Sequence, residues 1–117
     1  MRLTMIALAA VTAAAALAPA AGHATTLSPI QEGRRAWLKY NCYGCHGANG
    51  AGGMGPNIQH QEAGDVSSAM NGDAKEGGMI SFTGIATSTD AKNIAAYLGS
   101  IGTKNEPTWV DWWNPVP

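Results

Sequence analysis

Two cysteines and a histidine within five residues are the part of this chain best suited to chemistry. Cys42 and Cys45 are separated by two residues, and His46 follows directly. This spacing is the covalent attachment sequence for c-type haem. Each thiol adds to one haem vinyl group, a single helical turn reaches both vinyls, and the adjacent imidazole falls under the iron. The pattern therefore predicts a covalently bound haem with His46 as an axial iron ligand.

Two other chemistries use the same pair of cysteines. A thioredoxin-like redox dithiol has the Cys-x-x-Cys spacing, but it sits in a βαβ context, and no alternating strand pattern lies near Cys42. A structural zinc site needs four ligands. Beyond the first 24 residues, His46 and His60 are the histidines that could join the two cysteines. Haem attachment is therefore the favoured interpretation.

A haem iron bound by one histidine takes a sixth ligand or keeps an open site. Methionine opposite histidine raises the reduction potential and suits an electron carrier. Met54 follows His46 closely and is tied to the same side of the ring, while Met70 falls on the apolar face of a short helix. Met79 lies in a glycine-flanked loop far enough along the chain to return across the other face. We favour Met79, with His60 or an open site as the alternatives.

The segment after the histidine is rich in glycine and predicts an irregular loop from 47 to 58. Backbone without side chains can pack closely against a flat macrocycle. The free ring nitrogen of an axial histidine normally donates to a carbonyl or carboxylate. Pro56, which follows Gly55, is placed for its carbonyl to accept that hydrogen bond from His46.

The first 24 residues are typical of a cleavable export signal. Arg2 is followed by an apolar run from 6 to 17 and then by small residues, with cleavage expected after Ala24 and Ala20 or Ala21 as rivals. The run is shorter than the roughly 20 residues that span a bilayer, so we expect no stable membrane insertion. The expected location is the bacterial periplasm.

About 93 of the 117 residues remain after that cleavage, and they include many glycines and few large apolar side chains. A domain this small often needs a prosthetic group or another staple, and a buried haem would supply one. The formal charge is −1, and loss of Arg2 leaves −2. There is no basic patch, which excludes nucleic acid as a partner.

Three helices are expected to position these residues. The first follows the N-cap Ser28 and Pro29 and runs straight into the cysteine turn; it carries Gly33, which permits a close helix crossing. A short helix spans 65 to 70. The last spans 89 to 101, with Thr89 as its cap and Gly102 as its stop. Its apolar stripe is expected to cross the first helix near Gly33 and Trp37; the stripe is Ile94, Tyr97, Leu98 and Ile101.

The final segment, 104 to 117, differs in composition from the domain at 25 to 103. It holds three of the four tryptophans, at Trp109, Trp112 and Trp113, together with three prolines. Two roles are open for this tail: packing on the domain or docking onto a partner.

Taken together, residues 28 to 102 resemble a class I cytochrome c. The matched features, in order, are Gly33 with Trp37, Cys-x-x-Cys-His-Gly at 42 to 47, Gly55-Pro56-Asn57-Ile58, Gly78-Met79 with Phe82, and Ala95-Ala96-Tyr97-Leu98. The resemblance implies an all-α fold of three or more helices around one covalently bound haem c. It also implies Cys42 and Cys45 as attachment points, His46 and Met79 as iron ligands, and Pro56 as the residue that orients His46. Ile80 departs from the family pattern, in which proline often follows the methionine.

Three shorter stretches are similar to small cytochromes c that accept electrons from periplasmic quinoprotein alcohol dehydrogenases. They are the haem segment at 41 to 47, Gly-Gly-Met-Gly-Pro at 52 to 56, and the Trp-Trp-x-Pro-Val-Pro ending. The implied function is electron transfer rather than enzymatic catalysis. The donor would be a dehydrogenase containing pyrroloquinoline quinone, and the acceptor a terminal oxidase or another cytochrome. The alternative is a haem enzyme or gas sensor with an open iron site.

Overall fold

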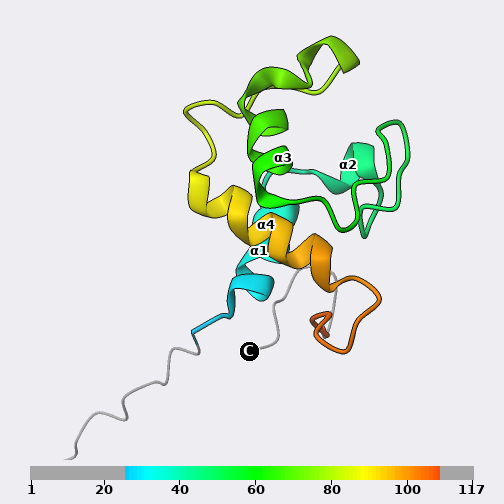
Figure 1. Ribbon diagram of the computed structural model, residues 1–117, viewed down its shortest axis with the longest axis vertical. Helices are drawn as coiled ribbons and strands as arrows, with labels where there is room; N and C mark the ends of the chain where they lie inside the picture. The colour runs from blue at the N-terminus through cyan, green and yellow to red at the C-terminus, as the bar shows by residue number, and fades with distance from the viewer. Residues whose placement is uncertain (1–25, 109–117) are drawn as a thin grey trace, which may run out of the picture.

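The computed structural model describes residues 26 to 108, and within that range the chain forms helices and loops without a β-strand (Figure 1). The expectation of an all-α fold with three or more helices is confirmed. The predicted export signal and the three tail tryptophans lie outside the described residues. The helices are α1 (Pro29–Lys39), α2 (Tyr43–His46), α3 (Ala63–Ser68), the π-helical turn η1 (Ala69–Asp73), the 3-10 turn η2 (Lys75–Gly77) and α4 (Ser88–Ser100).

Helix α1 begins as its sequence predicts. The Ser28 hydroxyl accepts the N–H of Gln31, the Gln31 side chain accepts the N–H of Ser28, and Pro29 occupies the first helical position. The helix ends at Lys39, so it does not run straight into the cysteine turn as expected. Asn41 adopts a left-handed conformation with φ of 57°, and this break turns the chain into α2.

The crossing of α1 with α4 forms the centre of the molecule, where α4 passes across α1 (Figure 1). A Cβ atom at Gly33 would collide with the Asn93 carbonyl and would lie 2.9 Å from Tyr97 Cβ. The absence of a side chain at Gly33 is therefore what lets the helices approach. The most deeply buried large side chains lie at this crossing or next to it: Trp37, Ile94 and Leu98.

The start of α4 differs from the sequence expectation. Thr87, rather than Thr89, is the N-cap: its hydroxyl accepts the N–H of Asp90, and the Asp90 carboxylate accepts the N–H of Thr87. This reciprocal pair requires a side chain that can accept a hydrogen bond three positions after the cap; Thr87 has Asp90 there, whereas Thr89 has Lys92. The apolar stripe is as predicted, with Ile94, Tyr97, Leu98 and Ile101 all buried.

Helix α3 packs on α4 and continues into an arm that leads to Met79. Met70 faces the core, as expected for the apolar side of this segment, and Val66 is buried with it. The helix begins earlier than predicted and does not stop at Asn71. It passes into the π-helical turn, in which Gly72 has a φ of 110°, and then into η2. Figure 1 shows this arm extending beyond α3, away from the α1–α4 crossing.

No helix within residues 26 to 108 is long and apolar enough to cross a membrane.

Gly33→Ala should weaken the fold, because the added methyl group meets the Asn93 backbone, which cannot move without shifting α4. We expect a loss of about 1–3 kcal/mol in the free energy of unfolding, measured by urea denaturation. Gly99→Ala is the matched control, because it lies in α4 with open space around its Cβ position. That variant should gain about 0.4–1 kcal/mol. Equal effects of the two substitutions would contradict the close crossing.

Candidate cofactor site

A cleft of about 320 Å³ lies between the cysteine turn and the segment that carries Met79. This volume falls within the range of cofactor and ligand sites. The cysteine turn and the glycine-rich loop contribute part of the lining, and the end of the arm contributes the rest. The lining residues are Tyr40, Asn41, Cys42, Cys45, His46, Met54, Gly55, Pro56, Gly77, Gly78, Met79, Ile80 and Phe82.

The short helix α2 and Cys42, the residue at its N-cap, contribute both cysteines and His46 to the lining of this cleft. The N–H of Cys42 donates to the Trp37 carbonyl at 3.1 Å, and the N–H of His46 donates to the Cys42 carbonyl at 3.0 Å. One turn of helix thus places Cys42, Cys45 and His46 along the same cavity. This is the arrangement that attachment of a macrocycle through two thioether bonds requires.

The state of the cysteines argues against a redox dithiol. Both are free thiols, and burial raises the pKa of Cys42 to about 11. A reactive dithiol depends on a thiol pKa lowered toward neutrality. The β-strands of a thioredoxin-like context are also missing from residues 26 to 108. A neutral, half-buried Cys42 fits an anchoring role better.

A zinc site lacks enough ligands. Within the part of the chain that the structure describes, no group of three or more His, Cys, Asp or Glu side chains could hold a metal ion. His60 does not join the two cysteines at the cleft. Its backbone N–H instead donates to the Leu98 carbonyl at the end of α4, at 3.3 Å.

His46 is buried, and its orientation is fixed from one side. The Pro56 carbonyl oxygen lies 2.9 Å from Nδ1. A carbonyl can only accept a hydrogen bond, so Nδ1 carries the proton and donates. This tautomer leaves the lone pair on Nε2, the nitrogen that a metal would bind. The contact expected between Pro56 and His46 is thus present in the structure.

The glycine-rich loop packs directly on the back of the cysteine turn. A Cβ atom at Gly55 would lie 2.9 Å from two atoms of the His46 ring, so a side chain there would displace the imidazole. The N–H of Gly55 donates to the Cys45 carbonyl at 2.8 Å, and the N–H of Gly52 donates to the His46 carbonyl at 2.8 Å. Gly55 therefore has no side chain because its backbone must lie against His46.

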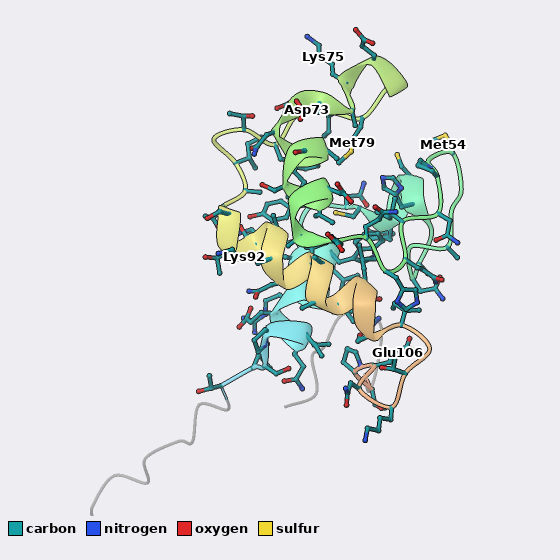
Figure 2. The ribbon with its side chains drawn as sticks, viewed as in Figure 1. Met54, Asp73, Lys75, Met79, Lys92 and Glu106 are labelled. Carbon is teal, nitrogen blue, oxygen red and sulfur yellow. The ribbon has the colours of Figure 1, made fainter. Side chains whose placement is uncertain are left out.

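Among the methionines, Met79 and Met54 line the cleft and Met70 does not. Met70 is 5% exposed and belongs to the core, as expected. Met54 is 89% exposed, whereas Met79 is half-buried and packs against the core. Figure 2 shows Met54 on the glycine-rich loop and Met79 on the segment that returns from the arm. Met79 therefore enters the cleft from a part of the chain remote from His46.

Two aromatic residues, Tyr40 and Phe82, complete the cleft; the sequence suggests Phe82 as a pocket or core residue, whereas Tyr40 was not assigned to the site. The rings of Tyr40 and Phe82 meet edge to face, with centroids 5.8 Å apart. The Tyr40 hydroxyl donates to the Asp90 carboxylate at 2.8 Å, and the Phe82 N–H donates to the Met70 carbonyl at 2.7 Å. These bonds connect the cleft wall to α4 and to the arm. Tyr40 lies two residues before Cys42 and Phe82 three after Met79, which is the signal that could have identified them.

The anchor of Tyr40 is a charged carboxylate. Hydrogen bonding from the Thr87 backbone, assisted by Tyr40, holds the pKa of Asp90 below its ordinary value. Burial raises the pKa of the Tyr40 phenol, and its bond to Asp90 adds to that rise. At neutral pH the pair is thus a phenol donating to a carboxylate, which is a strong type of hydrogen bond.

A comparison with protein families matches residues 28–98 to the model described as cytochrome C oxidase, cbb3-type, subunit III. The chain belongs to this family. It is a cytochrome c domain of the monohaem type, which supports the class I c-type assignment. Searches of curated proteins and of solved structures gave no significant match.

Membership of this family implies a cofactor, which is covalently bound haem c with its iron. The chemistry of the cleft fits this group. It offers two free thiols for attachment and an imidazole with an available Nε2, and it is otherwise lined by apolar or uncharged side chains and by backbone. Domains of this kind are usually electron carriers rather than enzymes.

Gly55→Ala should disturb the imidazole without unfolding the chain, because its added methyl group meets a side chain rather than backbone at closest approach. We expect an altered haem absorption spectrum and a shifted reduction potential. Gly64→Ala, in α3 with open space around its Cβ position, is the control and should leave both unchanged. An unaltered spectrum in Gly55→Ala would mean that the loop does not orient His46.

Proposed function

We propose that this protein is a monohaem electron carrier in which Cys42 and Cys45 hold haem c and His46 and Met79 bind its iron. The haem supplies reversible one-electron exchange between Fe(II) and Fe(III). The observation that supports this proposal is that a single cleft is lined both by the Cys-x-x-Cys-His turn and by Met79, which comes from a separate segment between η2 and α4.

The protein's own residues keep the iron ligands in place. Pro56 holds the His46 ring through its carbonyl, and Gly55 permits that approach. On the other side, the Met79 N–H donates to the Ala74 carbonyl at 3.3 Å, and Phe82 is bonded to Met70. A site held at both ligands changes little between oxidation states, which favours electron transfer over substrate binding at the iron.

Met79→Ala tests this assignment. The variant should lose the low-spin, methionine-ligated spectrum, lower the reduction potential and bind carbon monoxide when reduced, because methionine raises the potential and occupies the sixth position. Met54→Ala is the control, since Met54 also lines the cleft but is exposed to solvent. It should retain the wild-type spectrum. If the wild-type reduced protein binds carbon monoxide readily at neutral pH, the alternative of an open iron site is correct.

We further propose that the donor is a periplasmic quinoprotein alcohol dehydrogenase with pyrroloquinoline quinone, and that the acceptor is a terminal oxidase or another cytochrome. The similarity of segments 41 to 47, 52 to 56 and the tail to such electron acceptors supports the donor. The name of the matched family, a cytochrome c oxidase subunit, supports an acceptor of the oxidase type. The signal-like first 24 residues support export to the periplasm.

The donor is tested by mixing the oxidised protein with a panel of reduced periplasmic dehydrogenases in a stopped-flow instrument. The quinoprotein alcohol dehydrogenase should reduce it fastest. A chain shortened by residues 105 to 117 should fold and be reduced more slowly if the tail docks, whereas a loss of stability would assign the tail to packing. Faster reduction by a dehydrogenase of another cofactor class would overturn this donor.

A further inference from the structure

The phenol of Tyr40 joins the end of α1 to the first turn of α4. Its hydroxyl donates to Oδ2 of Asp90 at 2.8 Å. The helix cap already holds this carboxylate, because the same oxygen accepts the N–H of Thr87 at 2.9 Å. A phenol that donates to a fixed carboxylate forms a strong, charge-assisted hydrogen bond. Since α1 ends at Lys39, this bond, rather than a further turn of helix, holds the Tyr40 side chain at the wall of the cleft.

The Tyr40 ring in turn holds Phe82. The two rings meet edge to face at an interplanar angle of 66°, and Phe82 is buried. The backbone of Phe82 is bonded in both directions: its N–H donates to the Met70 carbonyl, and its carbonyl accepts the N–H of Ala86 at 3.0 Å. Phe82 is thus fixed through its backbone by the arm and by the turn into α4, and through its ring by Tyr40.

The position of Met79 depends on Phe82, because the segment before Met79 is loosely held. The N–H of Met79 donates to the Ala74 carbonyl at 3.3 Å, which is a long hydrogen bond. Cβ atoms at Gly77 and Gly78 would meet nothing within 4 Å. Met79 lies three residues before Phe82, and three residues of chain span at most about 10 Å. A shift of Phe82 would therefore move the methionine with it.

Phe82 also lines a second cavity, of about 170 Å³, between α3–η1 and the start of α4. Four polar side chains contribute to its lining: Ser67, Asn71, Thr87 and Ser88. The volume is far above the roughly 10–15 Å³ that one water molecule needs, so this polar cavity can hold water. Phe82 is the residue that the two linings share, and it therefore separates the haem cleft from the second cavity.

We propose that Tyr40 is a positioning residue: through its hydrogen bond to Asp90 it keeps Phe82 in place and so limits how readily another ligand replaces Met79 at the iron. The inference rests on the proposed function, because it takes Met79 to be the sixth ligand. Asp90 fixes the hydroxyl, the Tyr40 ring fixes Phe82, and Phe82 keeps the contents of the second cavity away from the Met79 side of the haem.

Imidazole is the probe, because it competes with methionine for the sixth position of the oxidised iron. Its binding to the holoprotein is followed by titration of the absorption spectrum. Tyr40→Phe removes the hydroxyl and keeps the ring, so the chain should fold while the wall opens more often. The apparent dissociation constant for imidazole should fall by at least about fivefold, because it varies inversely with the fraction of molecules whose site is open.

Asp90→Asn provides a second variant, which keeps an acceptor for Thr87 and loses the charge. It should raise the affinity for imidazole by a smaller factor than Tyr40→Phe does. The double variant Tyr40→Phe/Asp90→Asn should bind imidazole about as tightly as Tyr40→Phe alone, because both substitutions then act on one hydrogen bond. Independent effects that multiply in the double variant would show that the bond is not the cause.

Tyr97→Phe is the matched control. It also removes a phenol hydroxyl near the contact of α1 with α4, but Tyr97 is buried in the core and lines neither cavity. Its affinity for imidazole should equal that of the wild type even if its thermal stability falls. An equal rise in affinity in Tyr97→Phe would overturn the inference, because general loss of stability would then explain the result.

The outcomes also separate this inference from the proposed function. If the wild-type holoprotein has no methionine-ligated spectrum, the proposed iron ligation is wrong and the role of Tyr40 fails with it. If methionine ligation is present but Tyr40→Phe binds imidazole as the wild type does, the electron-carrier proposal stands and only the positioning role of Tyr40 is overturned.

Discussion

Trp37 is the residue on which the organisation of this molecule depends. It is 1% exposed at the crossing of α1 and α4, where its ring lies 6.0 Å from that of Tyr97. Its carbonyl accepts the N–H of Cys42, and its indole Nε1 donates to the Ala48 carbonyl at 3.2 Å. Both ends of the haem-binding segment are therefore bonded to one core residue. Because Gly33 lets α4 approach closely, the crossing that buries Trp37 also fixes where Cys42, Cys45 and His46 lie.

The site combines a firmly packed side with a loosely packed one. His46 lies against the glycine-rich loop and beside the Trp37 ring, with centroids 6.3 Å apart. Met79 is carried by an arm whose glycines at 77 and 78 have open space around them. Backbone bonds to Ala74 and the contact between Tyr40 and Phe82 are what define its position. In the proposed site, iron ligation by His46 and Met79 would join these two sides, and the haem would then contribute to the fold as well as to the function.

Particular residues show which features of the fold and the site could be predicted from the sequence. The capping box at Ser28, the apolar stripe of α4, the core position of Met70 and the contact between Pro56 and His46 all follow from local patterns, and the structure contains them. The cap of α4 was placed two residues too late, because two threonines precede Asp90 and only spacing distinguishes them. The end of α1 was missed because a left-handed Asn41 leaves no signal in hydrophobic periodicity. The identities of the two iron ligands stay a prediction, for which the cleft provides a shared location.

The sequence by itself determined the chemistry of this protein. The spacing of two cysteines and a histidine is compatible with few cofactors. Helix caps and glycine-dependent turns involve residues close together along the chain, so they can be recognised from residue types alone. The tertiary structure decided which distant residues share the cleft. Tyr40 and Phe82 join its wall, His60 is not part of its lining, and Met54 and Ile80 line it from two separate segments. Nearness along the chain hints at Tyr40 and Phe82, but no local pattern encodes the other placements, because they follow from how closely two helices cross and where the intervening loops must then pass.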